Sequence, residues 1–158
     1  MSIELDIPGT GHLELDGVVC DMNGTLTRDG ALENGVAGAL RALATELAIY
    51  VITADTFGSA QNTFAGLPVE LVRMETGRPG AEIKCDFIKR LGPDRHAALG
   101  NGRNDHLMLA EAALGICVIG PEGAHISSLT AADLAVTSPL QALELLLNPK
   151  RLVASLRN

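Results

Sequence analysis

The sequence is poor in aromatic residues. Its 158 residues include no Trp, one Tyr and three Phe, and the formal net charge is −7. Binding of single-stranded nucleic acid relies on exposed aromatic rings along a basic groove. A net negative charge would also repel a phosphate backbone over most of the surface. The composition therefore predicts no nucleic-acid partner, and any phosphate chemistry must be local, focused by a metal ion, a lysine or a helix N-terminus.

Long apolar runs and paired cysteines are also missing. No apolar run approaches the roughly 20 residues that a membrane-spanning helix needs, and residues 1–6 have neither the basic nor the apolar region of a secretory signal. The three cysteines are far apart, and Cys20 and Cys117 lie within apolar runs, where cysteine behaves as a small buried hydrophobe. These features predict a cytoplasmic protein with no membrane partner, disulfide or zinc site.

Two kinds of apolar pattern alternate along the chain. Residues 3–7 and 13–15 alternate around a Pro-Gly turn, which predicts an N-terminal β-hairpin. Beyond it, short apolar runs predict strands, and apolar residues at helical spacing predict helices. The strands are expected at 18–20, 48–52, 69–72, 96–99, 116–119 and 134–136, and the helices at 34–47, 56–66, 79–91, 103–113, 122–131 and, as the last one, 139–147. This alternation favours one α/β domain, residues 1–158, with a mainly parallel sheet.

Polar residues directly follow several of the predicted strands. Ligands bind outside the carboxyl ends of the strands in such sheets, so these residues should converge on one edge. Asp55 is also a candidate N-cap of the helix that follows it. The polar groups are residues 21–25, Thr53 with Asp55, residues 100–105, and Lys84 near the start of a helix.

These residue types suit phosphoryl transfer. A carboxylate at Asp21, where water is partly excluded, can attack phosphorus and form an aspartyl-phosphate. Mg²⁺ favours oxygen ligands, which Asp21, Asn101 and Asp105 could supply. Lys84 offers a point charge for a phosphate oxygen or for Asp21 itself. The Thr53 hydroxyl and the backbone N–H groups of the loop after Asp21 could bind the equatorial oxygens.

Two other phosphate-related patterns fit less well. Residues 100–105 begin like a dinucleotide-binding loop, but Asp105 stands where the third glycine of that fingerprint belongs. A response-regulator receiver would need an acidic pair at the first strand end and its phospho-acceptor at a later one. Here the first strand end offers Asp21 and Asn23, and residues 100–105 have no place in a receiver.

The ordered set of motifs resembles the haloacid dehalogenase (HAD) superfamily, and within it the small proteins similar to the phosphorylation domains of P-type ATPases. Asp21-Met22-Asn23-Gly24-Thr25-Leu26-Thr27 resembles the first motif, Asp-x-Asp-Gly-Thr-Leu-Thr, which in the ATPases reads Asp-Lys-Thr-Gly-Thr-Leu-Thr. Thr53 matches the end of the second motif and Lys84 the lysine of the third. Residues 100–105 match the Gly-Asp-Gly-x-Asn-Asp of the fourth.

The resemblance implies a three-layer Rossmann-like fold and a Mg²⁺-dependent phosphatase. Asp21 would be the nucleophile, and Thr53 and Lys84 would bind the phosphoryl group, next to the backbone of Gly24. The expected catalytic residues are therefore Asp21, Asn23, Thr53 and Lys84, and the expected metal-site residues are Asp21, Asn23 (through its carbonyl), Asn101 and Asp105.

Two positions depart from the family pattern. Family phosphatases carry their general acid/base at the position of Asn23, and such help is typically worth about 10²- to 10⁴-fold. Asn101 replaces a carboxylate metal ligand with a neutral amide, which should weaken Mg²⁺ binding. Because the ATPases have Thr at the position of Asn23, we expect a slow phosphatase or one specialised for good leaving groups. A catalytically silent binding or regulatory module is the alternative.

The spacing of the motifs leaves no room for a cap domain. Between Asp21 and residue 34 only a small flap fits, with a turn signal at residues 28–30. Arg28 in this flap and Arg103 in the Gly-rich turn are the candidates for substrate contact. Capless relatives either act on large substrates or close their sites with a neighbouring subunit. The expected partner is therefore a phosphorylated macromolecule in the first case and a small phosphorylated substrate in the second. The N-terminal hairpin is a candidate either for forming a homo-oligomer or for covering a sheet edge.

Overall fold

Six parallel strands form the centre of the fold. The computed structural model describes residues 1–54 and 57–158, so the candidate helix cap Asp55 lies outside the described residues. In the sheet the strands follow the order β10-β9-β8-β3-β6-β7, and every neighbouring pair is parallel. Their bounds are β3 Gly17–Asp21, β6 Ala48–Thr53, β7 Glu70–Arg73, β8 His96–Gly100, β9 Leu114–Val118 and β10 Leu134–Val136. The expected α/β class with a parallel sheet is confirmed.

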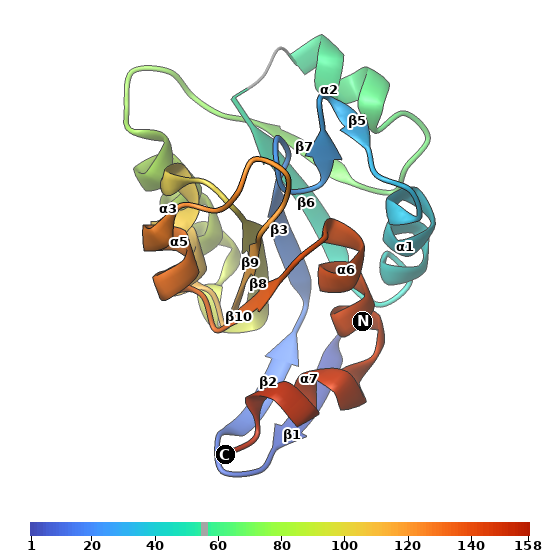
Figure 1. Ribbon diagram of the computed structural model, residues 1–158, viewed down its shortest axis with the longest axis vertical. Helices are drawn as coiled ribbons and strands as arrows, with labels where there is room; N and C mark the ends of the chain where they lie inside the picture. Colours follow the sequence, from blue (N-terminus) through green and yellow to red (C-terminus); the bar gives the residue numbers. More distant parts are fainter. Residues whose placement is uncertain (55–56) are drawn as a thin grey trace.

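Helices cover both faces of this sheet (Figure 1). On one face lie α1 (Val36–Leu43) and α6 (Pro139–Leu147), and on the other lie α3 (Gly80–Leu91), α4 (His106–Glu111) and α5 (Ile126–Ala131). A short helix, α2 (Phe57–Thr63), packs beside β7. Because side chains of a strand alternate between faces, Val18 and Cys20 join one apolar cluster and Val19 joins the other. This arrangement confirms the three-layer fold.

Several element boundaries differ from the prediction. The helix expected at 122–131 begins only at Ile126, because Gly120–Gly123 forms a turn in which the Gly123 N–H donates to the Gly120 carbonyl. The helix expected at 103–113 begins as a 3₁₀ turn, Arg103–Asp105, which continues into α4. The helices expected at 34–47 and 56–66 are shorter, and β9 begins two residues earlier than expected.

The expectation that 139–147 is the last helix is wrong. A further helix, α7 (Pro149–Leu156), follows directly after an interruption at Asn148, whose φ of −125° and ψ of 77° are not helical. Proline favours the first turn of a helix, where its missing N–H costs nothing. Leu152 of this helix is fully buried and belongs to the larger apolar cluster.

The N-terminal hairpin is confirmed, and it forms a sheet of its own. Strands β1 (Ile3–Ile7) and β2 (Gly11–Leu15) pair only with each other, while β10 and β7 are the edges of the large sheet. The hairpin therefore does not pair with either sheet edge. Instead α7 packs against β1, and the Asn158 N–H donates to the Pro8 carbonyl at 2.9 Å. Figure 1 shows the C-terminus beside the hairpin.

The expected flap is a second small hairpin between β3 and α1. Strands β4 (Thr27–Arg28) and β5 (Ala31–Leu32) are antiparallel, and Asp29 and Gly30 at its tip have φ of 51° and 81°. Within the described residues, the segment from β6 to α3 holds only α2, β7 and loops. Neither segment contains a cap domain in the described part of the chain.

The cysteines lie in the interior of the molecule, as their apolar surroundings predicted for Cys20 and Cys117. Cys20, Cys85 and Cys117 are buried and free. No helix in the described part of the chain is long and apolar enough to cross a membrane.

Candidate active site

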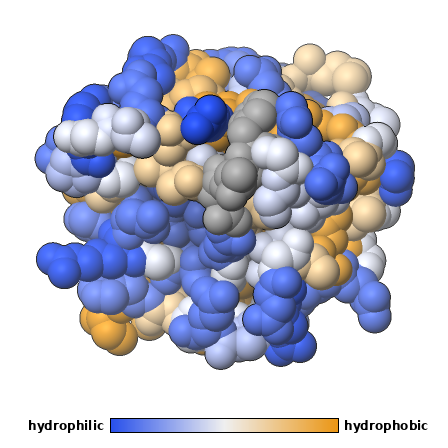
Figure 2. Space-filling view, turned by 90° about the horizontal axis from the view of Figure 1, so that it is seen from above, coloured by the Kyte–Doolittle hydropathy of each residue, from blue (hydrophilic) through white to orange (hydrophobic). Residues whose placement is uncertain are grey.

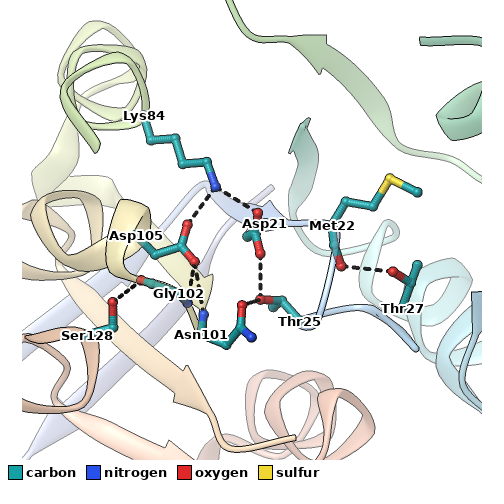
Figure 3. Close-up of polar contacts among 9 residues, drawn as sticks. All are labelled: Asp21, Met22, Thr25, Thr27, Lys84, Asn101, Gly102, Asp105 and Ser128. Atoms are coloured by element: carbon teal, nitrogen blue, oxygen red, sulfur yellow. Dashed lines mark hydrogen bonds and ion pairs between the residues drawn. The ribbon is translucent and has the colours of Figure 1, made fainter. Parts of the chain in front are cut away.

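Polar side chains from distant segments meet at the carboxyl end of the sheet (Figure 3). The central strand β3 ends at Asp21, with β8 on one side and β6 on the other. Asn101 directly follows β8, and Lys84 reaches the same point from α3. Figure 2 looks onto this end of the molecule, where hydrophilic residues predominate among scattered apolar ones. The strand order brings these residues together, since β3 lies between the two strands that carry the other motifs.

Lys84 is shared by two carboxylates. Its Nζ donates to Asp21 Oδ1 and to Asp105 Oδ1, each at 2.7 Å. The Lys84 side chain is 1% exposed and that of Asp105 is 0% exposed. Burial, the largest single influence, lowers the pKa of Lys84, but the two carboxylates together outweigh it and raise the pKa above its ordinary value. The ammonium group therefore stays charged and holds the two acids together.

Asp21 is a buried carboxylate whose charge is only partly compensated. Burial raises its pKa to about 6, and the nearby charge of Asp105 adds to this effect. Lys84 and the hydroxyl of Thr25 act in the opposite direction. A cation bound next to this carboxylate would stabilise its ionised form.

Asp105 holds the turn that follows β8. Its Oδ2 accepts the backbone N–H groups of Asn101 and Gly102, each at 3.0 Å, while Oδ1 accepts from Lys84. Gly100 makes this possible, because a Cβ there would lie 2.5 Å from the Cβ of Asp105. The Ser128 hydroxyl donates to the Gly102 carbonyl and fixes the other side of the turn. Asp105 therefore positions both Lys84 and Asn101.

Thr25 joins the first and fourth motifs, a role that the sequence analysis missed. Its fully buried hydroxyl lies 2.9 Å from Asp21 Oδ2 and 3.1 Å from Asn101 Oδ1. A hydroxyl carries only one proton, so these two acceptor oxygens converge on a single donor. The motif itself contains Thr25, but only the packed structure reveals which oxygens it connects.

The residues present fit a hard divalent cation. Asp21 Oδ2 and Asn101 Oδ1 lie side by side on Thr25, and carboxylate and amide oxygens are ligands that Mg²⁺ accepts. Both oxygens of Asp105 already accept protein donors. Among residues 1–54 and 57–158, no cluster of three or more His, Cys, Asp or Glu side chains could hold a metal by itself. A cation here would therefore also need backbone, amide or water oxygens.

The other predicted residues lie around this cluster. Thr53 is buried at the end of β6, beside β3, and Asn23 is exposed in the loop after Asp21, bridged to Thr27. The Gly24 N–H donates to the Thr27 carbonyl at 3.1 Å. The role of Gly24 as a phosphate donor stays a prediction.

The two candidate arginines line separate surface hollows. Arg28 contributes to a hollow of about 650 Å³ between the flap, the loop after β9 and the start of α6. Its guanidinium lies 3.9 Å from Glu33. Arg103 lines another of about 450 Å³, beside Pro79 and Gly80 at the start of α3. Neither hollow is lined by Asp21 or Lys84, so contact with a substrate stays a prediction for both arginines.

Known structures share this fold. The 3-deoxy-D-manno-octulosonate 8-phosphate (KDO 8-phosphate) phosphatase of Moraxella catarrhalis, solved with magnesium, phosphate and KDO, is 18% identical, with a TM-score of 0.69 over 90% of this chain and 94% of that one. A cobalt-bound deoxy-D-mannose-octulosonate 8-phosphate phosphatase of Haemophilus influenzae is 14% identical, with a TM-score of 0.69 over 87% of this chain and 90% of that one. A Legionella pneumophila protein described as a HAD superfamily (subfamily III A) hydrolase is 16% identical, with a TM-score of 0.70 over 90% of this chain and 87% of that one. The chain therefore has the HAD fold, as its motifs indicated.

Sequence comparison identifies one nearer relative. No protein-family model matches the chain. The protein described as uncharacterized protein MJ0073 of Methanocaldococcus jannaschii is 46% identical over 80 residues, which are 49% of this chain and 86% of that protein. The chain belongs to the same family as this protein.

Proposed function

We propose that the protein is a divalent-metal-dependent phosphohydrolase that works through an aspartyl-phosphate on Asp21. The observation that carries this proposal is the buried carboxylate of Asp21, held at Oδ1 by Lys84 and directed at Oδ2 toward Thr25 and Asn101. A nucleophile must be fixed and kept ionised beside the group it attacks. The HAD fold, shared with phosphatases of phosphorylated sugar acids, supports the same reaction class.

The reaction would proceed in two displacements. A carboxylate oxygen of Asp21 attacks phosphorus while the bond from phosphorus to the leaving oxygen breaks, and that oxygen departs with the electron pair. A water oxygen then attacks the phosphorus of the aspartyl-phosphate, the bond to Asp21 breaks with its electron pair returning to the carboxylate, and inorganic phosphate leaves with the protons of the water. Lys84 offsets negative charge on Asp21 and on the phosphoryl oxygens, and the Thr53 hydroxyl donates to one of those oxygens.

A divalent cation fits the reaction as well as the site. The Asp21 and Asn101 side chains and the backbone carbonyl of Asn23 would hold it. When bound, it supplies the positive charge that offsets repulsion between the carboxylate and the phosphate. The magnesium and cobalt complexes of the phosphatases that share the fold support a divalent ion, and we propose Mg²⁺.

The substrate is expected to carry a leaving group that is stable as an anion. Asn23 cannot donate a proton to the leaving oxygen, so an acyl phosphate or aryl phosphate needs the least help from the protein. We propose a small phosphorylated molecule as substrate. The phosphate and KDO bound in the Moraxella catarrhalis enzyme support this class.

Phosphate release tests the proposal. Acetyl phosphate and p-nitrophenyl phosphate are incubated with wild type, Asp21→Asn and, as a matched control for loss of one aspartate, Asp94→Asn in the 3₁₀ turn before β8. We expect Mg²⁺-dependent release from wild type and Asp94→Asn, suppressed by EDTA and absent in Asp21→Asn. Equal background rates in all three proteins would overturn the proposal.

A catalytically silent binding or regulatory module is the second candidate. The two asparagines, Asn23 and Asn101, favour it because each replaces a carboxylate of the family pattern. Such a module would bind inorganic phosphate with Mg²⁺ in calorimetry without turning over either substrate. Turnover by wild type excludes this candidate.

A further inference from the structure

Glu122 lies in a turn that reaches the candidate active site. The sequence predicted this residue within a helix, but it stands in the tight turn between β9 and α5. The Gly123 N–H donates to the Gly120 carbonyl at 2.8 Å, and the two glycines form an antiparallel bridge. Gly123 has a φ of 75°, which glycine adopts readily. The turn therefore holds the backbone of Glu122 in a defined position.

The same turn is docked on both motifs of the site. The carbonyl of Asn101 accepts the His125 N–H at 2.8 Å, which ties the end of the turn to the loop after β8. On the other side, a Cβ at Gly120 would lie 3.4 Å from the carbonyl of Gly24. The loop after β9 is thus in contact with the loops after β3 and β8.

The carboxylate of Glu122 points into this junction. Glu122 Oε2 and Asn101 Nδ2 each lie 2.5 Å from the position that a Cβ on Gly24 would occupy. Gly24 itself has a φ of 74°. The close approach of both groups is possible because residue 24 has no side chain. Glu122 therefore lies on the Nδ2 side of the Asn101 amide and next to Gly24, in the loop that follows Asp21.

The charge of the site explains why a further carboxylate would matter. Lys84 and Asp105 neutralise each other, so Asp21 is left as one negative charge facing a cation of charge +2. Asn101 adds an oxygen but no charge. Glu122 is exposed, and none of the ion pairs within the described ranges includes it. Its charge is therefore available to the site.

We propose that Glu122 supplies the second carboxylate of the divalent-cation site, bound directly or through one water, and so provides the charge that Asn101 lacks. Mg²⁺ retains several waters in protein sites, so a carboxylate one water away still contributes to binding. The inference rests on the proposed function, because it assumes the cation site centred on Asp21. It assigns a metal-binding role to a loop outside the four motifs.

Mg²⁺ binding measured by isothermal titration calorimetry, without substrate, tests the proposal. We compare metal-free wild type with Glu122→Gln, with the double variant Glu122→Gln/Asn101→Asp, and with Glu46→Gln, which removes an exposed glutamate elsewhere. Asp21→Asn serves as the reference for loss of the whole site. We expect Glu122→Gln to raise the Kd about 10-fold or more, in the range found when partners of metal ligands are removed. The double variant should recover the wild-type Kd, and Glu46→Gln should leave it unchanged.

Each other result has a definite meaning. A Glu122→Gln Kd equal to that of Glu46→Gln overturns the role of Glu122, while a weakened Asp21→Asn keeps the proposed function intact. If the double variant does not recover Mg²⁺ binding, the affinity depends on the conformation of the loop and not on the charge of Glu122. This result also overturns the inference. Equal binding by wild type and Asp21→Asn instead contradicts the Asp21-centred site of the proposed function.

Discussion

Replacing Lys84 with methionine should destabilise the protein strongly. The change keeps most of the side-chain volume but removes the ammonium that lies 2.7 Å from both Asp21 and Asp105. Two buried carboxylates are then left facing each other. Removing one partner of a buried ion pair costs about 3–5 kcal/mol, which is a large part of the roughly 5–15 kcal/mol that stabilises a domain. We therefore expect Lys84→Met to lose about 3–5 kcal/mol of unfolding free energy in urea denaturation without Mg²⁺.

The same helix supplies a matched control. Lys89 lies on α3, is 53% exposed, and approaches Glu111 only to 4.0 Å. Surface pairs of this kind contribute about 0–1 kcal/mol, so Lys89→Met should unfold close to wild type. In the double variant Lys84→Met/Asp105→Asn one of the uncompensated charges is removed, and we expect part of the lost stability to return. Equal unfolding free energies for Lys84→Met and Lys89→Met would refute the reasoning.

Three further predictions concern other parts of the molecule. Asn23→Asp should raise turnover of alkyl phosphates by about 10²-fold or more and change acyl phosphates little; no gain with either would count against a missing proton donor. Leu152→Ala should lower the unfolding free energy by about 2–5 kcal/mol, because Leu152 is the residue of α7 that is fully buried in the larger apolar cluster; a loss under about 1 kcal/mol would contradict this packing. Arg95, hydrogen-bonded to Glu14 and Asp16, lowers the pKa of both. Their contribution to stability is therefore present above the ordinary carboxyl pKa of about 4 and disappears as the pH falls through the lowered pKa values. Arg95→Gln should accordingly have a lower free energy of unfolding than wild type at neutral pH, and the two values should converge in acid. Urea denaturation at several pH values measures this difference, and a difference that is independent of pH would refute the assignment.

The strands were predictable because a buried parallel strand has a strong local signature. Val18 to Cys20 and Ala97 to Leu99 are fully buried in short apolar runs, as expected for strands covered on both faces. Helix ends were predicted less well. Residues 122–125 have a helix-compatible composition, yet Gly123 turns the chain before α5 begins. The sequence analysis placed no helix after residue 147, because the buried position of Leu152 depends on packing against the hairpin, which is far away along the chain.

The sequence by itself determined the core of the candidate site. Once strands and helices alternate, the ends of β3 and β8 must lie on one edge, so Asp21 and residues 100–105 were expected to be close. The strand order and the position of α3 then bring Asp21, Asp105 and Lys84 into contact. Only the tertiary structure decided that Thr25 joins Asp21 to Asn101, and that Glu122 approaches over Gly24. Periodicity places a residue on a strand or a helix. Contacts between loops depend instead on where each turn ends and on which glycine leaves space for a distant side chain, and these are properties of the packed chain.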